Sequence, residues 1–427
     1  MKKYFYDKLT EKEIAVLTLR PAIEFEKTFE IVRPILRDVK ENGLKAALSY
    51  AQKFDGFTGN SLRVSKEEFE EAAQLLDDKV KSALEIAAKN IEKFHLGQVP
   101  KGYTTETMPG VECSREFRAI ENTGLYIPGG SAVLPSTMLM LGIPAKIAGC
   151  KRVFACSPAK EGKINPPLLY AAGLCGINEF YKIGGAQAIA LMAYGAEGIT
   201  KADKIFGPGN QFVTAAKMLL TTELSGCAID MPAGPSEVLV IADEDANPAF
   251  IASDLLSQAE HGKDSQVVLA TISEELAEAV TNELEKQLAQ LPRKELAAKS
   301  LDNSYLLIVS SLQTAVAFSN LYAPEHLIMH ISNAENFKEQ VTNAGSVFLG
   351  SYSPESAGDY ASGTNHSLPT YGYARNYSGV NVGSFMKSVT FQRLSKSGLQ
   401  NIAQTVETLA ETEGLFAHKN AVSIRLK

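Results

Sequence analysis

The spacing of apolar residues predicts helices in the first part of the chain. Ser65 followed by Glu68 forms a capping box, which is typical of a helix N-terminus, and Asp77 or Asp78 begins the next helix. Apolar residues then recur every three or four positions, and they share one face of this second helix: Val80, Leu84, Ala87, Ile91 and Phe94. We therefore expect a packed helical layer in this region.

From about Tyr126 the pattern changes to short apolar strands that alternate with glycine turns and helices. A first set of expected strands is Val153–Ala155, Phe180–Ile183 and Lys204–Phe206. A second set is Glu237–Ala242, Val267–Thr271, Tyr305–Val309, Leu327–Ile331 and Ser346–Leu349. Repeated strand–turn–helix units predict parallel sheets with helical crossovers. The sequence therefore predicts an α/β protein with two sheets.

Between Gly350 and Phe385 the periodicity stops, and the segment is rich in Gly, Ser, Tyr and Asn. A structureless segment of this length inside a compact protein is usually a functional loop or a linker. Because it contains Asp359 and His366, we expect a functional loop. After about Ser397 the tail predicts one helix, which is followed by acidic residues and a histidine.

Composition excludes several classes of protein. The 427 residues carry 42 basic and 49 acidic side chains, a net charge of −7, and no basic run, which argues against nucleic acid or an anionic membrane as a partner. The first residues lack the apolar core of a secretory signal, and no stretch of apolar residues is long enough to span a bilayer. Five cysteines without a Cys-x-x-Cys pair favour a reducing, cytoplasmic location. None lies in a context that suggests a thiolate nucleophile, which argues against thioester chemistry.

The chain has only six histidines, so each is worth placing. His95 ends a polar helix and is expected on the surface. His330 alternates within an expected strand and is expected to be structural. His366 is expected to order the long loop.

Gln258 and His261 are three residues apart, so on a helix they share a face and can reach one ion. With Asp359 and His418 they would form a mixed nitrogen and oxygen site suited to Zn²⁺ or a similar divalent ion. The alternative is a capped helix end with polar surface residues.

Glu325 and His326 follow Pro324 at the entrance of an expected strand. A carboxylate beside an imidazole is suited to general acid–base chemistry. Adjacent residues in an extended segment point in opposite directions, so the two are expected to serve different steps rather than to bond to each other. The alternative is an exposed pair of loop residues.

Glycine turns occur where two of the expected strands give way to helices. Gly184-Gly185 and Gly207-Pro208-Gly209 lie at such points, where backbone N–H groups favour a pyrophosphate. Neither a G-x-G-x-x-G motif nor a P-loop is present. The alternative is a pair of ordinary strand-to-helix turns.

Two further segments are distinctive, Ile229–Glu237 (IDMPAGPSE) and Asp254–His261 (DLLSQAEH). Both resemble the sequence signature of the histidinol dehydrogenase family. Shorter similar segments are Gly124–Gly130, Gly207–Asn210, Ala323–His326, Ser362–His366 and Glu413–Leu415 with His418. Together they extend over nearly the whole chain, without a departure at an expected functional position.

The resemblance implies a zinc- and NAD-dependent oxidation of L-histidinol to L-histidine through the aldehyde, which is the last step of histidine biosynthesis. It implies Gln258, His261, Asp359 and His418 as zinc ligands and Glu325 with His326 as the catalytic pair. By the same resemblance, the substrate would be surrounded by Ser236, Gln258, His261, His326, Asp359, Glu413 and His418. NAD would be contacted by Tyr126, Gln187 and Asn210.

The fold implied by the resemblance has two incomplete Rossmann-like parallel-sheet domains, a helical N-terminal region and a small C-terminal tail domain. We expect an N-terminal arm of residues 1–24 and a main domain of residues 25–125 plus 236–380. Residues 126–235 would form the second Rossmann-like domain. Residues 381–427 would form a tail that docks on the partner subunit of an intertwined homodimer, so that Glu413 and His418 would enter the partner's site.

Two other functions remain open at this stage. A zinc hydrolase would use Glu325 as a base with the same metal and without NAD. A metal-binding homologue without catalytic activity would keep the ligands and lose the pair, and the presence of both Glu325 and His326 argues against it.

Overall fold

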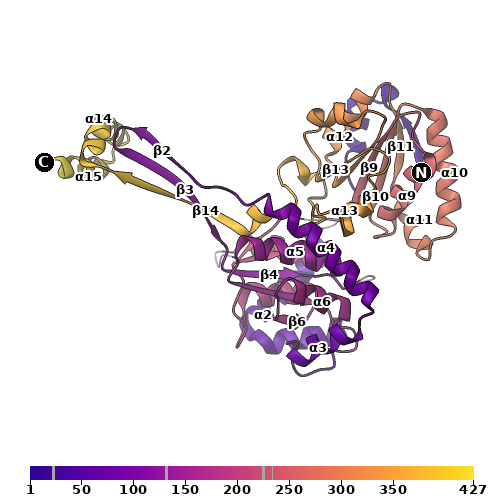
Figure 1. Ribbon diagram of the computed structural model, residues 1–427, viewed down its shortest axis with the longest axis horizontal. Coiled ribbons are helices and arrows are strands. Elements are labelled where there is room, and N and C mark those ends of the chain that lie inside the picture. Colours follow the sequence, from indigo (N-terminus) through magenta and orange to yellow (C-terminus); the bar gives the residue numbers. More distant parts are fainter. Residues whose placement is uncertain (22–24, 130–132, 224–226, 233) are drawn as a thin grey trace.

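The computed structural model describes residues 1–21, 25–129, 133–223, 227–232 and 234–427. Gly130 of one family-like segment, Ala233 of another and the last residues of the expected N-terminal arm, 22–24, lie outside this range. Two α/β bodies lie side by side, and a narrow arm that carries the C-terminus projects away from both (Figure 1). The expected α/β fold class is confirmed.

The larger sheet has six parallel strands. In spatial order they are β1 (Lys2–Phe5), β11 (Tyr305–Ile308), β10 (Gln266–Thr271), β9 (Glu237–Ala242), β12 (His326–His330) and β13 (Ser346–Leu349). If β9 to β13 are numbered 1 to 5 along the chain, their spatial order is 3-2-1-4-5. The N-terminal strand β1 is added at one edge, beside β11. This is the order of a Rossmann sheet that lacks its sixth strand.

Helices cover both faces of the six-stranded sheet because its strands are apolar at successive positions. In β9, Val238 and Val240 pack on one face, and Leu239 and Ile241 pack on the other. The first face is covered by α9 (Pro248–Ala259), α10 (Glu274–Leu288) and α11 (Lys294–Asp302). The second face is covered by α12 (Leu312–Tyr322) and α1 (Glu11–Leu17). The N-terminal arm is therefore part of this body.

The smaller sheet has five parallel strands. In spatial order they are β6 (Phe180–Lys182), β5 (Arg152–Ser157), β4 (Asn122–Tyr126), β7 (Lys204–Phe206) and β8 (Ala228–Ile229). Counted from β4, the order is again 3-2-1-4-5, so both sheets are incomplete Rossmann-like sheets. The helices that connect these strands are α5 (Pro135–Ala148), α6 (Pro166–Leu174), α7 (Gly185–Tyr194) and α8 (Gln211–Leu220).

The N-terminal helices pack on the five-stranded body. They are α2 (Phe25–Phe54), α3 (Lys66–Leu75) and α4 (Asp78–Leu96). Helix α2 contacts α7 and α8, α3 contacts α6, and α4 contacts α5 and α6. Their buried residues share one core with the segment from Leu125 to Met231. This packing differs from the expected grouping of residues 25–125 with 236–380, because an amphipathic helix pattern does not specify which sheet the apolar face meets.

The projecting arm is an antiparallel sheet that the apolar pattern did not predict. Its strands are β14 (Met386–Leu394), β3 (Val111–Ala119) and β2 (Tyr103–Met108), and every residue of β2 is exposed. Beyond them lie α14 (Lys396–Thr412) and α15 (Phe416–Leu426), which contact each other at the far end of the arm (Figure 1). Only the first of these two helices was predicted.

The segment between β13 and β14 is more ordered than its composition suggested. It contains α13 (Glu355–Tyr360) and the short 3₁₀ helices η3 (Tyr373–Arg375) and η4 (Val382–Phe385). Two further 3₁₀ helices are η1 (Tyr6–Lys8) and η2 (Ala334–Gln340). His366 lies 2.9 Å from the carbonyl oxygen of Asp359 and 3.0 Å from the Thr137 hydroxyl, so the predicted loop-ordering role of His366 is supported.

The prediction for His330 is confirmed, whereas the prediction for His95 is wrong. His330 is buried in β12 and bonds to Asp254 at 3.1 Å, as expected of a structural residue. His95 is fully buried rather than on the surface. Its ring lies 3.3 Å from the Asn365 amide. His95 lies one turn beyond Ile91 on the same buried face of α4. None of the described helices is long and apolar enough to cross a bilayer.

Candidate active site

The candidate site lies at the amino edge of the six-stranded sheet. Glu237 is the first residue of β9 and His326 is the first residue of β12, and these two strands are neighbours. Helix α9 runs back across the sheet, so its last turn brings Gln258 to the same edge, and His261 follows directly. The Gln258 and His261 spacing seen in the sequence therefore places both residues beside the Glu325–His326 pair.

Glu325 and His326 are buried, with 6% and 3% of their surfaces exposed, so the alternative of an exposed loop pair is wrong. The expectation that they point in opposite directions is also wrong. The Glu325 carboxylate lies 3.6 Å from His326 Nδ1, because Glu325 precedes the regular strand and its side chain turns back toward the ring. His326 Nε2 faces the Asp359 carboxylate at 3.5 Å.

The electrostatics of the pair follow from burial among carboxylates. Burial raises the pKa of Glu325 to about 8, against the opposing effect of His326. Burial alone would lower the pKa of His326, but Glu355, Glu325 and Asp359 outweigh it and raise this pKa to about 10. Burial likewise raises the pKa of Glu355 to about 8. The site therefore favours a positive charge at its centre, carried either by the imidazolium ring or by a divalent ion.

The amide of Gln258 is oriented by its surroundings. Its Nε2 donates to the Glu237 carbonyl oxygen at 3.2 Å and to Glu325 at 3.4 Å, and it lies 3.0 Å from His326 Nδ1. Because these three neighbours gather around the nitrogen, the amide oxygen faces the other way. That oxygen is buried and has no hydrogen-bond partner among the described residues.

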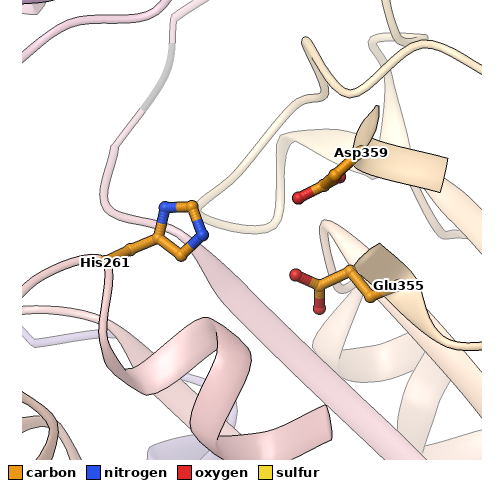
Figure 2. A group of neighbouring side chains, drawn as sticks. All are labelled: His261, Glu355 and Asp359. Carbon is orange, nitrogen blue, oxygen red and sulfur yellow. The ribbon is translucent and has the colours of Figure 1, made fainter. Parts of the chain in front are cut away.

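His261, Glu355 and Asp359 form a group whose ligand atoms all lie within 4.8 Å of one another (Figure 2). The two carboxylates come from α13, four residues apart, and point toward the His261 ring. Glu355 was missed in the sequence, although its spacing to Asp359 would have suggested it once a helix was assumed there.

These residues fit a divalent cation. Gln258 Oε1, Asp359 Oδ1 and Glu355 Oε2 are all buried without a hydrogen-bond partner in the part of the chain that the structure describes. A buried carboxylate oxygen without a partner is costly, and a bound cation would satisfy it. Imidazole nitrogen with carboxylate and amide oxygen is a donor set that suits zinc.

Two predicted residues are not brought to this site within one chain. Glu413 follows α14 and His418 lies in α15, and both are exposed at the far end of the arm, well away from α13 (Figure 1). Ser236, in contrast, directly precedes β9 and so lies at the same sheet edge as Glu237.

The predicted cofactor residues lie on the other body, at the carboxyl edge of the five-stranded sheet. Tyr126 ends β4, Gln187 lies in the first turn of α7, and Asn210 caps α8. Strands β4 and β7 are neighbours in the sheet, and the strand order reverses between them. Rossmann-like sheets bind their ligands at the carboxyl ends of the strands, beside the place where the strand order reverses.

The helix N-termini at this edge already have partners. Gly184 N–H donates to Asp55 at 2.9 Å, and Gly185 N–H donates to the Tyr126 hydroxyl at 3.0 Å. The Asn210 side chain accepts two N–H groups of α8. The expectation that a pyrophosphate binds on these N–H groups is therefore not supported, and ordinary strand-to-helix turns describe them better.

The cysteines agree with the absence of thiolate chemistry. All five are free, and three of them are buried. Burial raises the pKa of Cys175 to about 12 and that of Cys227 to about 12, and it raises the pKa of Cys156 as well. Burial therefore disfavours the thiolate form of these three side chains.

Comparison with known proteins agrees with the resemblance seen in the sequence. The family model described as histidinol dehydrogenase matches residues 18–426. The histidinol dehydrogenase of Mannheimia succiniciproducens is 53% identical over 427 residues, which cover 100% of this chain and 99% of that protein. The chloroplastic histidinol dehydrogenase of Arabidopsis thaliana is 51% identical, over 100% of this chain and 92% of that protein.

A solved structure extends this agreement to the whole fold. The crystal structure of histidinol dehydrogenase from Elizabethkingia anophelis superposes with a TM-score of 0.96 at 54% identity, and the match covers 100% of this chain and 98% of that one. Likeness of this extent, in sequence and in three dimensions, covers both α/β bodies and the projecting arm. The chain therefore belongs to the histidinol dehydrogenase family.

Proposed function

We propose that this protein is a histidinol dehydrogenase, which oxidises L-histidinol to L-histidine through the aldehyde with two NAD, as the last step of histidine biosynthesis. The observation that carries the proposal is the buried Glu325–His326 pair beside a group of unsatisfied metal-type ligands, in a chain of this family. The five free cysteines support the cytoplasmic location predicted from the sequence.

Zinc and NAD are the proposed cofactors. Gln258, His261 and Asp359 would hold the zinc with His418, which would come from a second copy of the chain. The metal would supply positive charge that fixes and orients the amine and imidazole of the substrate. NAD would accept the hydride of each oxidation.

The proposed nucleotide site is the carboxyl edge of the five-stranded sheet, with Tyr126, Gln187 and Asn210 as its contacts. Ser236 at the edge of the six-stranded sheet and Glu413 of the second copy would complete the substrate pocket, where the Glu413 carboxylate would hold a cationic or N–H-bearing group. The Glu413 role is a prediction from the family resemblance.

In the proposed chemistry His326 is the base. Its Nδ1 lies 3.3 Å from the Glu237 carbonyl oxygen. With a divalent ion carrying the positive charge of the site, the ring would be neutral, and with Nδ1 donating to this carbonyl Nε2 would take the proton of the substrate hydroxyl. After the first oxidation His326 would act again, on the hydrated aldehyde.

Glu325 would activate the water that hydrates the aldehyde. Burial raises its pKa to about 8, and a general base is most effective when its pKa lies near the working pH. The pair is nearly closed to solvent, and this protects the aldehyde from bulk water.

We also propose a homodimer in which the arm crosses to the partner. Strand β2 is exposed along its whole length, and α14 and α15 contain only two buried residues, Gly398 and Ala410. Such an arm is expected to need a partner surface. His418 and Glu413 would be delivered to the neighbouring site by this contact.

The stoichiometry of NADH tests the proposed function. One site that performs both oxidations should form two NADH for each histidinol consumed, without release of the aldehyde. The chain has no Trp, so NADH fluorescence can be followed without that background. A ratio of one with aldehyde in solution would contradict the proposal, and a lack of NADH formation with histidinol and NAD would favour the zinc hydrolase.

A second experiment tests the division of roles. Replacing His326 by Asn should lower alcohol oxidation by about 10²-fold or more, because it removes the base. Replacing Glu325 by Gln should slow oxidation of supplied aldehyde more than oxidation of the alcohol. Equal loss in both half-reactions for Glu325→Gln would contradict the assigned role.

A further inference from the structure

A buried ion pair joins the N-terminal arm to the active-site edge of the six-stranded sheet. Arg20 Nε lies 2.6 Å from Glu237 Oε2, and Arg20 Nη2 lies 2.7 Å from Glu237 Oε1. The side chains are only 4% and 1% exposed. The guanidinium group also lies 3.6 Å from the centre of the Tyr322 ring, which fixes its plane. This two-point geometry is specific to arginine.

Glu237 in turn bonds to the proposed catalytic glutamate through both of its ends. Its Oε1 accepts the backbone N–H of Glu325 at 3.2 Å, and its own N–H donates to Glu325 Oε2 at 2.9 Å. The two glutamates are therefore held by a reciprocal pair of hydrogen bonds. One of these bonds orients the carboxylate of Glu325, and the other fixes its backbone.

The turn that leads into Glu325 needs such support. Ala323 ends α12 with a φ of 53°, a left-handed conformation that is unfavourable for a residue with a Cβ. Arg20 Nη2 donates to the Ala323 carbonyl oxygen at 3.2 Å, while Nη1 donates to Thr18 at 2.7 Å. Arg20 thus contacts both the strained turn and the carboxylate that holds the next residues.

We propose that Arg20 and Glu237 are positioning residues that fix the Glu325 carboxylate in the orientation needed to activate water. The inference rests on the proposed function, since it assigns the second oxidation to Glu325. It also gives the N-terminal arm a role in the reaction, because β1 and α1 anchor the segment that ends at Arg20. Neither side chain touches the reacting atoms, so both side chains act through Glu325, while the backbone carbonyl of Glu237 separately faces His326.

The first test is Arg20→Lys, which keeps the charge and loses the planar fork. Substitutions of residues that orient active-site groups typically cost 10- to 100-fold, so we expect aldehyde oxidation to fall by about 10-fold or more. Alcohol oxidation should fall by a smaller factor, because His326 contacts the backbone carbonyl of Glu237, which the pairing of β9 with β12 holds in place without the Arg20 side chain. A purely structural role would lower both half-reactions together.

A matched control comes from the Arg152–Glu179 pair at the edge of the five-stranded sheet. This pair has the same two-point geometry, with Nε–Oε2 at 2.8 Å, and Arg152 also lies over an aromatic ring, at 4.2 Å from its centre. Arg152→Lys should leave the ratio of the two half-reactions unchanged. A changed ratio in this variant would show that loss of any such pair has the same effect.

A double variant guards against loss of folding. Arg20→Met with Glu237→Gln removes both charges together, and the new amide oxygen at position 237 still accepts from Glu325 N–H. This variant should also shift the ratio, because no guanidinium group orients residue 237 or the Ala323 turn, while no unpaired buried charge is left to unfold the chain. Adding Arg20→Lys to Glu325→Gln should cost little beyond Glu325→Gln alone, because both changes act on the same group.

The outcomes separate the two proposals. If Glu325→Gln does not slow aldehyde oxidation selectively, the role assigned to Glu325 is wrong whatever Arg20 does. If Glu325→Gln behaves as expected while Arg20→Lys and the double variant both keep the wild-type ratio, the positioning role of Arg20 and Glu237 is wrong. The expected result is a shifted ratio for Arg20→Lys and an unshifted ratio for Arg152→Lys.

Discussion

Restoring activity by mixing two inactive variants would show whether the arm crosses between subunits. His261 belongs to the body of the chain, beside Asp359 on α13, whereas His418 lies on α15 at the far end of the arm (Figure 1). If the arm crosses, the two histidines of one site come from different chains. His261→Ala and His418→Ala homodimers would then each lack one ligand in both sites.

The expected magnitude follows from this geometry. In an equal mixture with free exchange, about half of the dimers combine one chain of each kind. A mixed dimer has one site that lacks both ligands and one site that is intact. Activity should therefore approach about a quarter of the wild-type value at the same total concentration.

The assay is NADH formation from histidinol after the variants have been incubated together under conditions that allow exchange. The matched control mixes His261→Ala with Asp359→Ala, because both ligands come from the same chain and no mixed dimer regains an intact site. No recovery with His418→Ala, despite demonstrated exchange, would mean that His418 acts within its own chain. The crossed arm would then have to be abandoned.

Three further predictions concern stability and metal binding. Phe385→Ala should lower the free energy of unfolding by about 3 to 5 kcal/mol in urea titrations, because this fully buried ring stacks on Phe206 at 3.9 Å at the root of the arm; a loss below about 1 kcal/mol would contradict this. Burial lowers the pKa of His95, so as pH falls below about 6.5 the unfolded chain binds a proton that the folded side chain does not, and stability should fall by up to about 1.4 kcal/mol per pH unit. His95→Leu should lack this part of the pH dependence. If the free energy of unfolding of this variant falls with pH as steeply as that of the wild type, the role given to His95 is refuted. Zinc at about 100 times its dissociation constant should stabilise the protein by about 2.7 kcal/mol in thermal unfolding, and Gln258→Leu or Asp359→Asn should reduce the shift; equal shifts in these variants would place the metal elsewhere.

Local pattern was sufficient for most of the secondary structure. Strands such as β7, β9 and β13 have the predicted bounds, and the Ser65–Glu68 capping box begins α3 as expected. These elements are decided by short-range features: a run of apolar residues, a glycine turn, or a capping side chain. The strands β2, β3 and β14 were missed because β2 and β14 are largely exposed and β3 is largely half-buried, so they lack the apolar signal that marks a buried strand.

The candidate site was predicted in part. Gln258, His261, Glu325 and His326 were recognisable from short motifs, and Asp359, already a candidate ligand in the long segment, was also implied by the resemblance. Glu355 was missed because no helix was expected in its segment. His95 was placed on the surface because a helix pattern does not reveal that a distant loop, carrying Asn365, covers that face.

The sequence by itself therefore determined most of the elements and the family, and it indicated most of the candidate site residues, because each of these depends on short motifs along the chain. Only the tertiary structure decided that α2, α3 and α4 cover the five-stranded sheet and that Arg20 meets Glu237. These contacts join segments that are far apart along the chain; Arg20 and Glu237, for example, are 217 positions apart. An amphipathic face or a charged side chain specifies the kind of partner that it needs, and the packing of the whole chain selects which partner it meets.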